Sequence, residues 1–172
     1  FGAGRRWLTR GISARLLGDW QFANILTLGT GQPVTAILPT ALSGTQSNGT
    51  DRPDLVANPN LPGNQRSPER WFNTDAFQSP PIYFDQQGAF SIPGNSGRNV
   101  LTGPDTKVWD TSVERRFHFS ERTNLVFRTD FFNLTNHPNF DRPGLIFGTS
   151  NFARINSAQN SRQIQFSLRL NW

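Results

Sequence analysis

Two histidines and a pair of aspartates are the side chains in this sequence that could hold a metal ion. His118 and His137 are not at metal-ligand spacing, either with each other or with an acidic cluster. Asp51 and Asp54 lie beside several asparagines, and such an oxygen-rich stretch can bind calcium, although it is more often plain loop. Cysteine is absent, which removes thiolate ligands and thiol nucleophiles. We therefore predict no metal site and no cofactor.

Catalysis and nucleic-acid binding are also poorly supported. Many serines and aspartates are present, but no G-x-S-x-G nucleophile elbow accompanies them. The net charge of +5 would suit an anionic partner, yet the arginines are dispersed, and only Arg5-Arg6 and Arg115-Arg116 are adjacent. We predict that the chain is not an enzyme, has no catalytic residue and does not bind nucleic acid.

Strict alternation of apolar and polar residues at the C-terminus is the strongest pattern in the sequence. Successive side chains of a β-strand point to opposite faces of the sheet. The range 162–172 therefore predicts a strand with one apolar and one polar face. The apolar positions are Ile164, Phe166, Leu168, Leu170 and Trp172.

Three further ranges show the same period. They predict strands near residues 20–31, 107–117 and 123–133, and the last two form an antiparallel hairpin across a short turn. Asn24 and Arg115 interrupt the apolar faces of their strands. A weaker strand is expected within residues 5–16. The fold class is all-β, an antiparallel meander of four to five long strands.

Long connections with little periodicity separate these strands. They run near residues 39–105 and 134–161, and the first contains most of the 12 prolines. A short helix is expected at residues 67–72, capped by Ser67, with Pro68 at its first position. Short strands are expected near Phe147 and Ile155.

Strands of about 10 residues, joined alternately by short turns and long loops, are typical of outer-membrane β-barrels. In such a wall one face meets lipid and the other an aqueous lumen, and aromatic residues gather at the membrane interfaces. We therefore predict an incomplete segment of a transmembrane barrel with long extracellular loops, in contact with the lipid of a bacterial outer membrane. The alternative is a soluble β-sandwich module that binds carbohydrate on a secreted protein.

The barrel hypothesis assigns roles to side chains of each class. Trp20 and Trp172 would mark one membrane interface and Trp109 and Phe131 the other. The candidate lumen-lining residues, which could instead pair with one another across neighbouring strands, are Glu114, Arg116, Arg128, Asp130 and Arg169. The candidate loop contacts to a ligand, which could equally be packed within the loop, are Trp71, Phe72, Phe77, Tyr83 and Phe84.

Four stretches resemble the C-terminal end of TonB-dependent outer-membrane receptors, in particular a large-loop group with carboxypeptidase-regulatory-like N-terminal domains. They are LLGDWQFANILTLGTGQPVT (Leu16 to Thr35), ERWFNTDAF (Glu69 to Phe77), GNSGRNVLTGPDTKVWDTSVERRFHFSERTNLVFRTDFFNLTNHPNF (Gly94 to Phe140) and RQIQFSLRLNW (Arg162 to Trp172). They cover most of the chain in consistent order and spacing.

The resemblance implies a 22-stranded barrel, plugged by an N-terminal domain and energised through TonB. It implies that the last strand, through Ile164, Phe166, Leu168, Leu170 and Trp172, is the signal read by the barrel-assembly machinery. Residues 1–172 would be the C-terminal barrel segment of such a receptor, which takes up an unidentified small ligand. Because neither a plug nor a TonB-contacting segment is recognised here, and four or five strands cannot close the barrel, we expect a fragment that is not functional alone.

Overall fold

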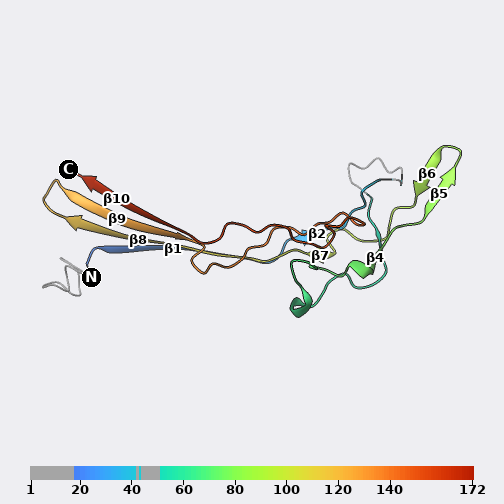
Figure 1. Cartoon of the computed structure of the whole chain (residues 1–172), viewed down its shortest axis with the longest axis horizontal. Helices are drawn as coiled ribbons and strands as arrows, with labels where there is room; N and C mark the ends of the chain where they lie inside the picture. The colour runs from blue at the N-terminus through green and yellow to red at the C-terminus, as the bar shows by residue number, and fades with distance from the viewer. Residues whose placement is uncertain (1–17, 42, 44–50) are drawn as a thin grey trace. The chain divides into compact units, whose positions relative to one another are not determined.

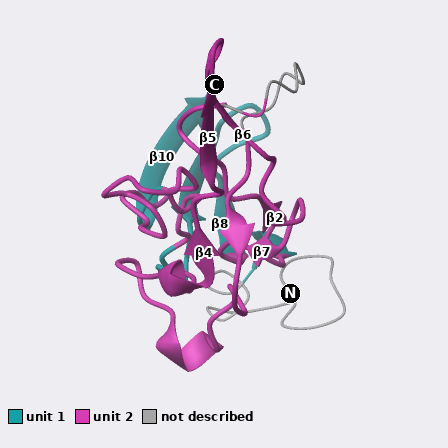
Figure 2. Ribbon diagram, turned by 90° about the vertical axis from the view of Figure 1, so that its right-hand side faces the viewer, with its two compact units in different colours: residues 1–28, 107–138, 160–172 teal, residues 29–106, 139–159 magenta. Residues whose placement is uncertain are grey.

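The computed structural model describes residues 18–41, 43 and 51–172, which fall into two units (Figure 2). Unit 1 contains Phe1–Leu28, Lys107–Pro138 and Asn160–Trp172, and unit 2 contains Gly29–Thr106 and Asn139–Gln159. The strand expected within residues 5–16 lies outside the described residues. No helix in the described part of the chain is long and apolar enough to cross a membrane.

A four-stranded sheet in the order β1-β8-β9-β10 forms unit 1 (Figure 1). Its strands are β1 (Trp20–Gly29), β8 (Thr106–His118), β9 (Asn124–Phe132) and β10 (Gln163–Asn171). Alternating aromatic and branched residues favour strands because they pack on a pleated, half-covered surface. The prediction of an all-β, antiparallel meander is confirmed.

The three C-terminal strands pair antiparallel without a break in register. Ile164 lies opposite Phe131 at one end of the β9–β10 ladder, and Leu170 lies opposite Leu125 at the other. Along β8 and β9, Thr111 pairs with Phe131 and Phe117 with Leu125. One continuous register fixes which side chains share a face in all three strands.

A tight turn joins β8 to β9. The Phe119 and Ser120 amides both donate to the Thr123 carbonyl, at 3.0 and 3.1 Å. The Ser120 hydroxyl accepts from the Arg122 and Thr123 amides. The β1–β8 and β9–β10 connections, in contrast, are long, and both leave the sheet at the end opposite this turn.

Unit 2 consists of short paired strands and 3₁₀ turns. The paired strands are β2 (Pro33–Val34) with β7 (Leu101–Thr102), β3 (Asp54–Leu55) with β4 (Phe77–Gln78), and β5 (Ile82–Asp85) with β6 (Gly88–Ser91). The 3₁₀ helices are η1 (Gly63–Gln65) and η2 (Thr74–Ala76). The sequence does not predict these paired strands, because strands this short carry no measurable alternation.

An aromatic cluster forms the core of unit 2. Phe152 is its centre, with ring centroids 5.0 Å from Phe72, 5.3 Å from Phe147 and 5.5 Å from Phe77, all edge to face. This geometry is the favourable one for aromatic quadrupoles. The buried side chains around them are Val34, Ala36, Ala76, Leu101 and Ala153. Both long connections contribute to this core.

Gly144 allows two parts of the second long connection to approach each other closely. It forms a parallel bridge with Phe152, and its amide donates to the Arg154 carbonyl at 2.8 Å. A Cβ at residue 144 would overlap the backbone carbonyl of Asn151. No other residue type fits at this position without moving backbone.

The prediction of a helix at residues 67–72 is wrong. Ser67 and Arg70 instead exchange backbone hydrogen bonds at 3.1 Å around a tight turn. Tertiary bonds hold the flanking backbone in this form, because the Pro68 carbonyl accepts from the Ile155 amide and the Trp71 amide donates to Ala153. A serine cap followed by a proline favours the start of a helix. The hydrogen-bond partners Ala153 and Ile155 are distant in sequence, so the local pattern could not indicate them.

The short strands expected near Phe147 and Ile155 do not form. That region contains only isolated bridges, such as Ile37 with Ile146 and Phe140 with Ala158. Ile155 is in irregular backbone and is buried. Leu145, Phe147, Phe152 and Ala153 of this connection pack into the core of unit 2 and make no ladder.

Candidate functional site

The sheet of unit 1 presents one largely apolar surface, called here the apolar face. Side chains directly opposite one another in a ladder lie on the same face, so the register of β8, β9 and β10 defines it. Contacts of Asn24 with Trp109 and Thr111 place the even-numbered side chains of β1 on the same face. Its apolar members are Trp20, Phe22, Leu26, Leu28, Trp109, Val113, Phe117, Leu125, Phe127, Phe131, Ile164, Phe166, Leu168 and Leu170.

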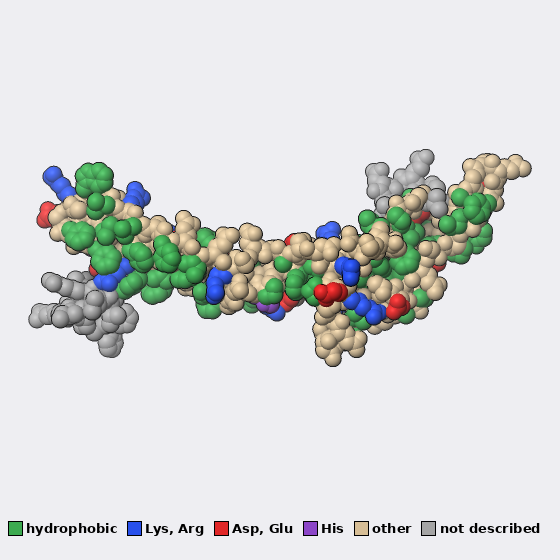
Figure 3. Space-filling view, in the orientation of Figure 1, with side chains coloured by type: hydrophobic (Ala, Val, Ile, Leu, Met, Phe, Trp, Pro, Cys, Tyr) green, Lys and Arg blue, Asp and Glu red, His purple; other side chains and the backbone are tan. Residues whose placement is uncertain are grey.

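This face is bare. Phe22, Leu28 and Phe166 are 65 to 69% exposed. Figure 3 shows hydrophobic side chains gathered over the strands of unit 1. A continuous apolar surface of this kind marks contact with a partner or with lipid, because single exposed apolar residues are scattered on ordinary soluble surfaces.

Aromatic side chains lie near the two ends of the apolar face. Trp20 begins β1 and Trp172 follows β10, both at the end of the sheet that carries the β8–β9 turn. Trp109 and Phe131 lie toward the other end, where Phe131 pairs with Ile164. The structure thus brings the candidate interface aromatics to two opposite ends of one surface, as two interfacial belts would require.

Among the polar residues on the apolar face, Asn24 and Arg115 interrupt its pattern, and each contacts neighbouring side chains. Asn24 Oδ1 accepts from Thr111 Oγ1 at 2.8 Å and from Trp109 Nε1 at 3.3 Å. The Arg115 guanidinium carbon lies 4.5 Å from the centroid of Phe117 and 5.3 Å from that of Trp20. From the sequence alone, Asn24 and Arg115 only interrupt the alternation of their strands. Their partners on neighbouring strands cannot be identified until the register of those strands is known.

The opposite surface, called here the polar face, brings the five candidate lumen-lining residues together. Arg128 donates to both oxygens of Asp130, at 2.8 to 3.0 Å. Arg116 lies 3.7 Å from Glu114. These ion pairs run along a strand, between residues two apart, whereas pairing across strands is the alternative raised by the sequence. Glu114 lies opposite Arg128 in the ladder, and Arg169 lies opposite Val126.

A groove of about 220 Å³ opens on unit 1 at the turn end of β1 and β8. Glu114, Arg116 and His118 contribute to its wall, so His118 lies at a charged edge of the polar face. His137 lies elsewhere, and its amide donates to Asn133 Oδ1. The lining residues are Asp19, Trp20, Gln21, Glu114, Arg116 and His118.

The candidate calcium ligands have structural roles in unit 2. Asp51 is buried, and its carboxylate accepts from the amide and hydroxyl of Ser43. Asp54 accepts from the Asn95 amide at 2.8 Å, while Asn95 Oδ1 accepts from Leu55. Within the described residues, no three His, Cys, Asp or Glu side chains cluster as metal ligands would.

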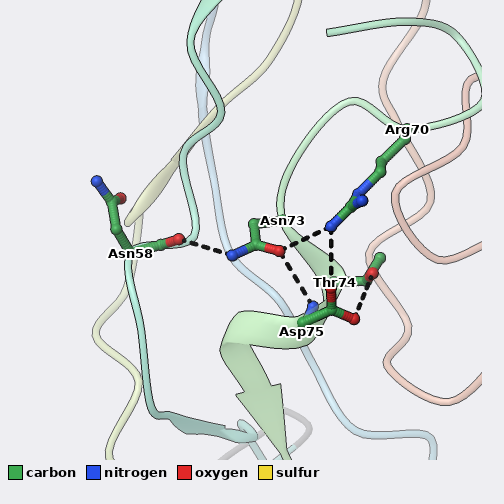
Figure 4. Close-up of polar contacts among 5 residues, drawn as sticks. All are labelled: Asn58, Arg70, Asn73, Thr74 and Asp75. Atoms are coloured by element: carbon green, nitrogen blue, oxygen red, sulfur yellow. Dashed lines mark hydrogen bonds and ion pairs between the residues drawn. The ribbon is translucent and has the colours of Figure 1, made fainter. Parts of the chain in front are cut away.

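The stretch Glu69–Phe77 is organised by its polar residues (Figure 4). Asn73 Oδ1 accepts from the Asp75 amide, which caps η2, and also from Arg70 at 2.9 Å. Arg70 completes the group with an ion pair to Asp75 at 3.0 Å. The backbone N–H of Glu69 and the Ser67 hydroxyl donate to the Glu69 carboxylate and lower its pKa. These contacts hold the outer side of a segment whose phenylalanines turn inward.

The five candidate ligand-contacting aromatics have different environments. Phe72 and Phe77 are 2% and 4% exposed within the core of unit 2, so packing explains them and a ligand could not reach them in the folded unit. Trp71 is half-buried, and its indole N–H donates to the Thr102 carbonyl at 3.0 Å. Tyr83 and Phe84, on the β5–β6 hairpin, are exposed, and Tyr83 stacks on Phe90.

One comparison with known proteins decides the family. A family model for an outer membrane beta barrel domain matches residues 1–165 of the 172. The chain belongs to this family of outer-membrane β-barrels. No curated protein and no solved structure gives a significant match.

Membership of this family explains why the sheet of unit 1 has an exposed apolar face. The strands form a segment of a transmembrane barrel wall in the bacterial outer membrane, as predicted. In a barrel of this kind the apolar face meets hydrocarbon and the polar face meets the lumen. Because such barrels keep short turns in the periplasm, the β8–β9 turn is the periplasmic end of the sheet, and both long connections leave on the extracellular side. A β-sandwich, which needs two packed sheets, does not describe unit 1.

Proposed function

We propose that this chain is the C-terminal barrel portion of a TonB-dependent outer-membrane receptor, of the large-loop group, that takes up a small ligand. The observation that carries the proposal is the folded state of the two extracellular connections. They combine in unit 2 around an aromatic core, whereas a barrel that served only as a membrane anchor would need no such module. The resemblance of the four sequence stretches supports the same assignment.

In this proposal, binding and transport replace catalysis. The extracellular module captures the ligand, an N-terminal plug rearranges under energy delivered through TonB, and the ligand passes into the periplasm. Tyr83 and Phe84 remain the candidate contacts in the module because they are exposed, in contrast to Phe72 and Phe77. The charged residues of the polar face would line the passage or contact the plug.

The same proposal assigns β10 to barrel assembly. It is an edge strand of the described sheet, and its exposed apolar residues end near the terminal Trp172. An edge strand presents unpaired backbone N–H and C=O groups, which an assembly factor can pair before the barrel closes. The partners are therefore lipid, the assembly machinery, TonB and an unidentified small ligand, with no nucleic acid among them.

Uptake from a complex medium tests the proposal without knowledge of the ligand. Wild-type cells, cells lacking this gene and cells lacking TonB are grown in the same medium, and the compounds that disappear are compared by mass spectrometry. We expect at least one compound to be consumed by the wild type and spared by both mutants. A gene-deletion strain that loses uptake of a compound still consumed without TonB would contradict energised transport.

A further inference from the structure

Arg115 is a charged residue within the apolar face. It lies opposite Phe127 in the β8–β9 ladder, with Val113 and Phe117 on either side along β8. The neighbouring Arg116 lies on the polar face and pairs with Glu114. The two arginines are thus adjacent in sequence but face different solvents, and only Arg115 extends among lipid-facing side chains.

The position of Arg115 along β8 sets its depth in the membrane. It lies three positions before His118, where β8 ends, a distance of ~10 Å at ~3.3 Å per residue. A strand tilt of ~40° reduces this to ~8 Å below the strand end. An arginine side chain can extend that far to place its guanidinium at the headgroup level. At that level an arginine costs much less free energy than it would at the midplane of the membrane.

Two aromatic rings hold the guanidinium at this level. Its central carbon is 4.5 Å from the Phe117 centroid and 5.3 Å from the Trp20 centroid, both within cation–π range. Trp20 comes from β1 and Phe117 from β8, so the packing of two strands sets the orientation of the group. A guanidinium stacked on ring faces directs its N–H bonds within its own plane, where a phosphate accepts two of them.

We propose that Arg115, with Trp20 and Phe117, forms a binding site for the headgroup phosphate of an anionic phospholipid in the periplasmic leaflet. The rings give the site an apolar floor for the first methylenes of the lipid, and the guanidinium supplies the positive charge. The site depends on the barrel and its orientation and is independent of transport, so it can fail or succeed separately from the proposed receptor function.

The test is lipid binding to the intact protein, purified in detergent and stripped of lipid. Phosphatidylglycerol, which is anionic, is added in steps, and the lipids retained per protein are counted by native mass spectrometry. The variants are R115L, which replaces the charge by an apolar group suited to the lipid face, and R116L as the adjacent control on the polar face. Heat-modifiable migration on gels verifies that each variant is folded.

We expect R115L to need at least fivefold more phosphatidylglycerol than the wild type for its tightest lipid, and R116L to stay within twofold of the wild type. W20L, which keeps the arginine but removes one ring, should weaken binding about threefold. Equal phosphatidylglycerol binding by R115L and the wild type would overturn the proposal. Equal loss in R115L and R116L would also overturn it, because the effect would then follow net charge and not the site.

Discussion

Asn24 Oδ1 and Thr111 Oγ1 are 2.8 Å apart on the lipid-facing side of the sheet, joining β1 to β8. The same oxygen also accepts from the indole N–H of Trp109. Hydrocarbon offers no hydrogen-bond partners, so polar groups at this depth must satisfy one another. The asparagine that interrupts the apolar pattern of β1 is therefore a tie between two strands that are distant in sequence.

Replacing Asn24 by leucine should weaken the barrel, although leucine is the more apolar side chain. The Thr111 hydroxyl and the Trp109 N–H lose this acceptor in lipid, and we expect the free energy of unfolding to fall by about 1–3 kcal/mol. Urea unfolding in lipid vesicles measures the change. Gln21→Ala, on the polar face of the same strand, is the control and should change little. Adding Thr111→Val to Asn24→Leu should recover part of the loss, and a double variant weaker than the single one would contradict this role.

A charge introduced on β10 should be tolerated on one face and not on the other. Phe166→Arg, near the middle of β10 on the apolar face, places a guanidinium in hydrocarbon and should cost about 2–4 kcal/mol in unfolding free energy. Gln165→Arg lies opposite Asp130 on the polar face and should cost less than about 1 kcal/mol. The yield of folded protein in outer membranes and the urea midpoint both report the difference. Equal penalties at the two positions would argue against lipid on either face.

Gly144→Ala should open the extracellular module without dissolving the barrel. The added Cβ would overlap the Asn151 carbonyl, and the parallel bridge to Phe152 would separate. Protease added to intact cells should then cleave unit 2 much faster than in the wild type. Gly63→Ala is the matched control, because nothing lies within 4 Å of a Cβ there. Unchanged cleavage of the Gly144 variant would show that the two parts of this connection do not pack closely at Gly144.

The Arg128–Asp130 pair on the polar face should contribute little to stability. Arg128 is 47% exposed, and ion pairs that water can reach are worth roughly 0–1 kcal/mol. Asp130→Asn should therefore lower the free energy of unfolding by less than about 1 kcal/mol, measured as above at low and at physiological salt. A loss above about 2 kcal/mol would mean that the lumen around this pair excludes water.

The barrel strands could be predicted from sequence because one solvent lies on each side of the sheet. Lipid and water impose strict alternation, so β10 and the β8–β9 hairpin can be recognised without any knowledge of their neighbours. The meander prediction also makes β1 and β8 neighbours, but which of their residues face one another needed the structure, because residues 39–105 separate the two strands. The partners of Asn24 and Arg115 could not be inferred, because both residues contact the neighbouring strand of that pair.

The fold of unit 2 could not be predicted from the sequence, for a different physical reason. Its core depends on contacts between two connections, such as Phe72 with Phe152, and not on any local period. At Ser67 the local pattern gave a wrong prediction, because a serine cap followed by a proline favours a helix. Long-range hydrogen bonds of Pro68 and Trp71 instead hold this segment in a turn. The aromatic residues of the first connection could be recognised in the sequence. Only the structure shows that Phe72 is buried and Phe84 is exposed.

The most direct test of the central claim is the environment of four consecutive residues of β10. The chain contains no cysteine, so single cysteines can be placed at residues 165, 166, 167 and 168 of the intact protein and spin-labelled in lipid vesicles. Electron paramagnetic resonance then compares collisions with oxygen, which concentrates in lipid, and with a nickel chelate, which stays in water. We predict strong oxygen collisions at 166 and 168 and strong chelate collisions at 165 and 167. The same accessibility at all four residues, or the opposite alternation, would contradict a barrel wall with the apolar face in lipid.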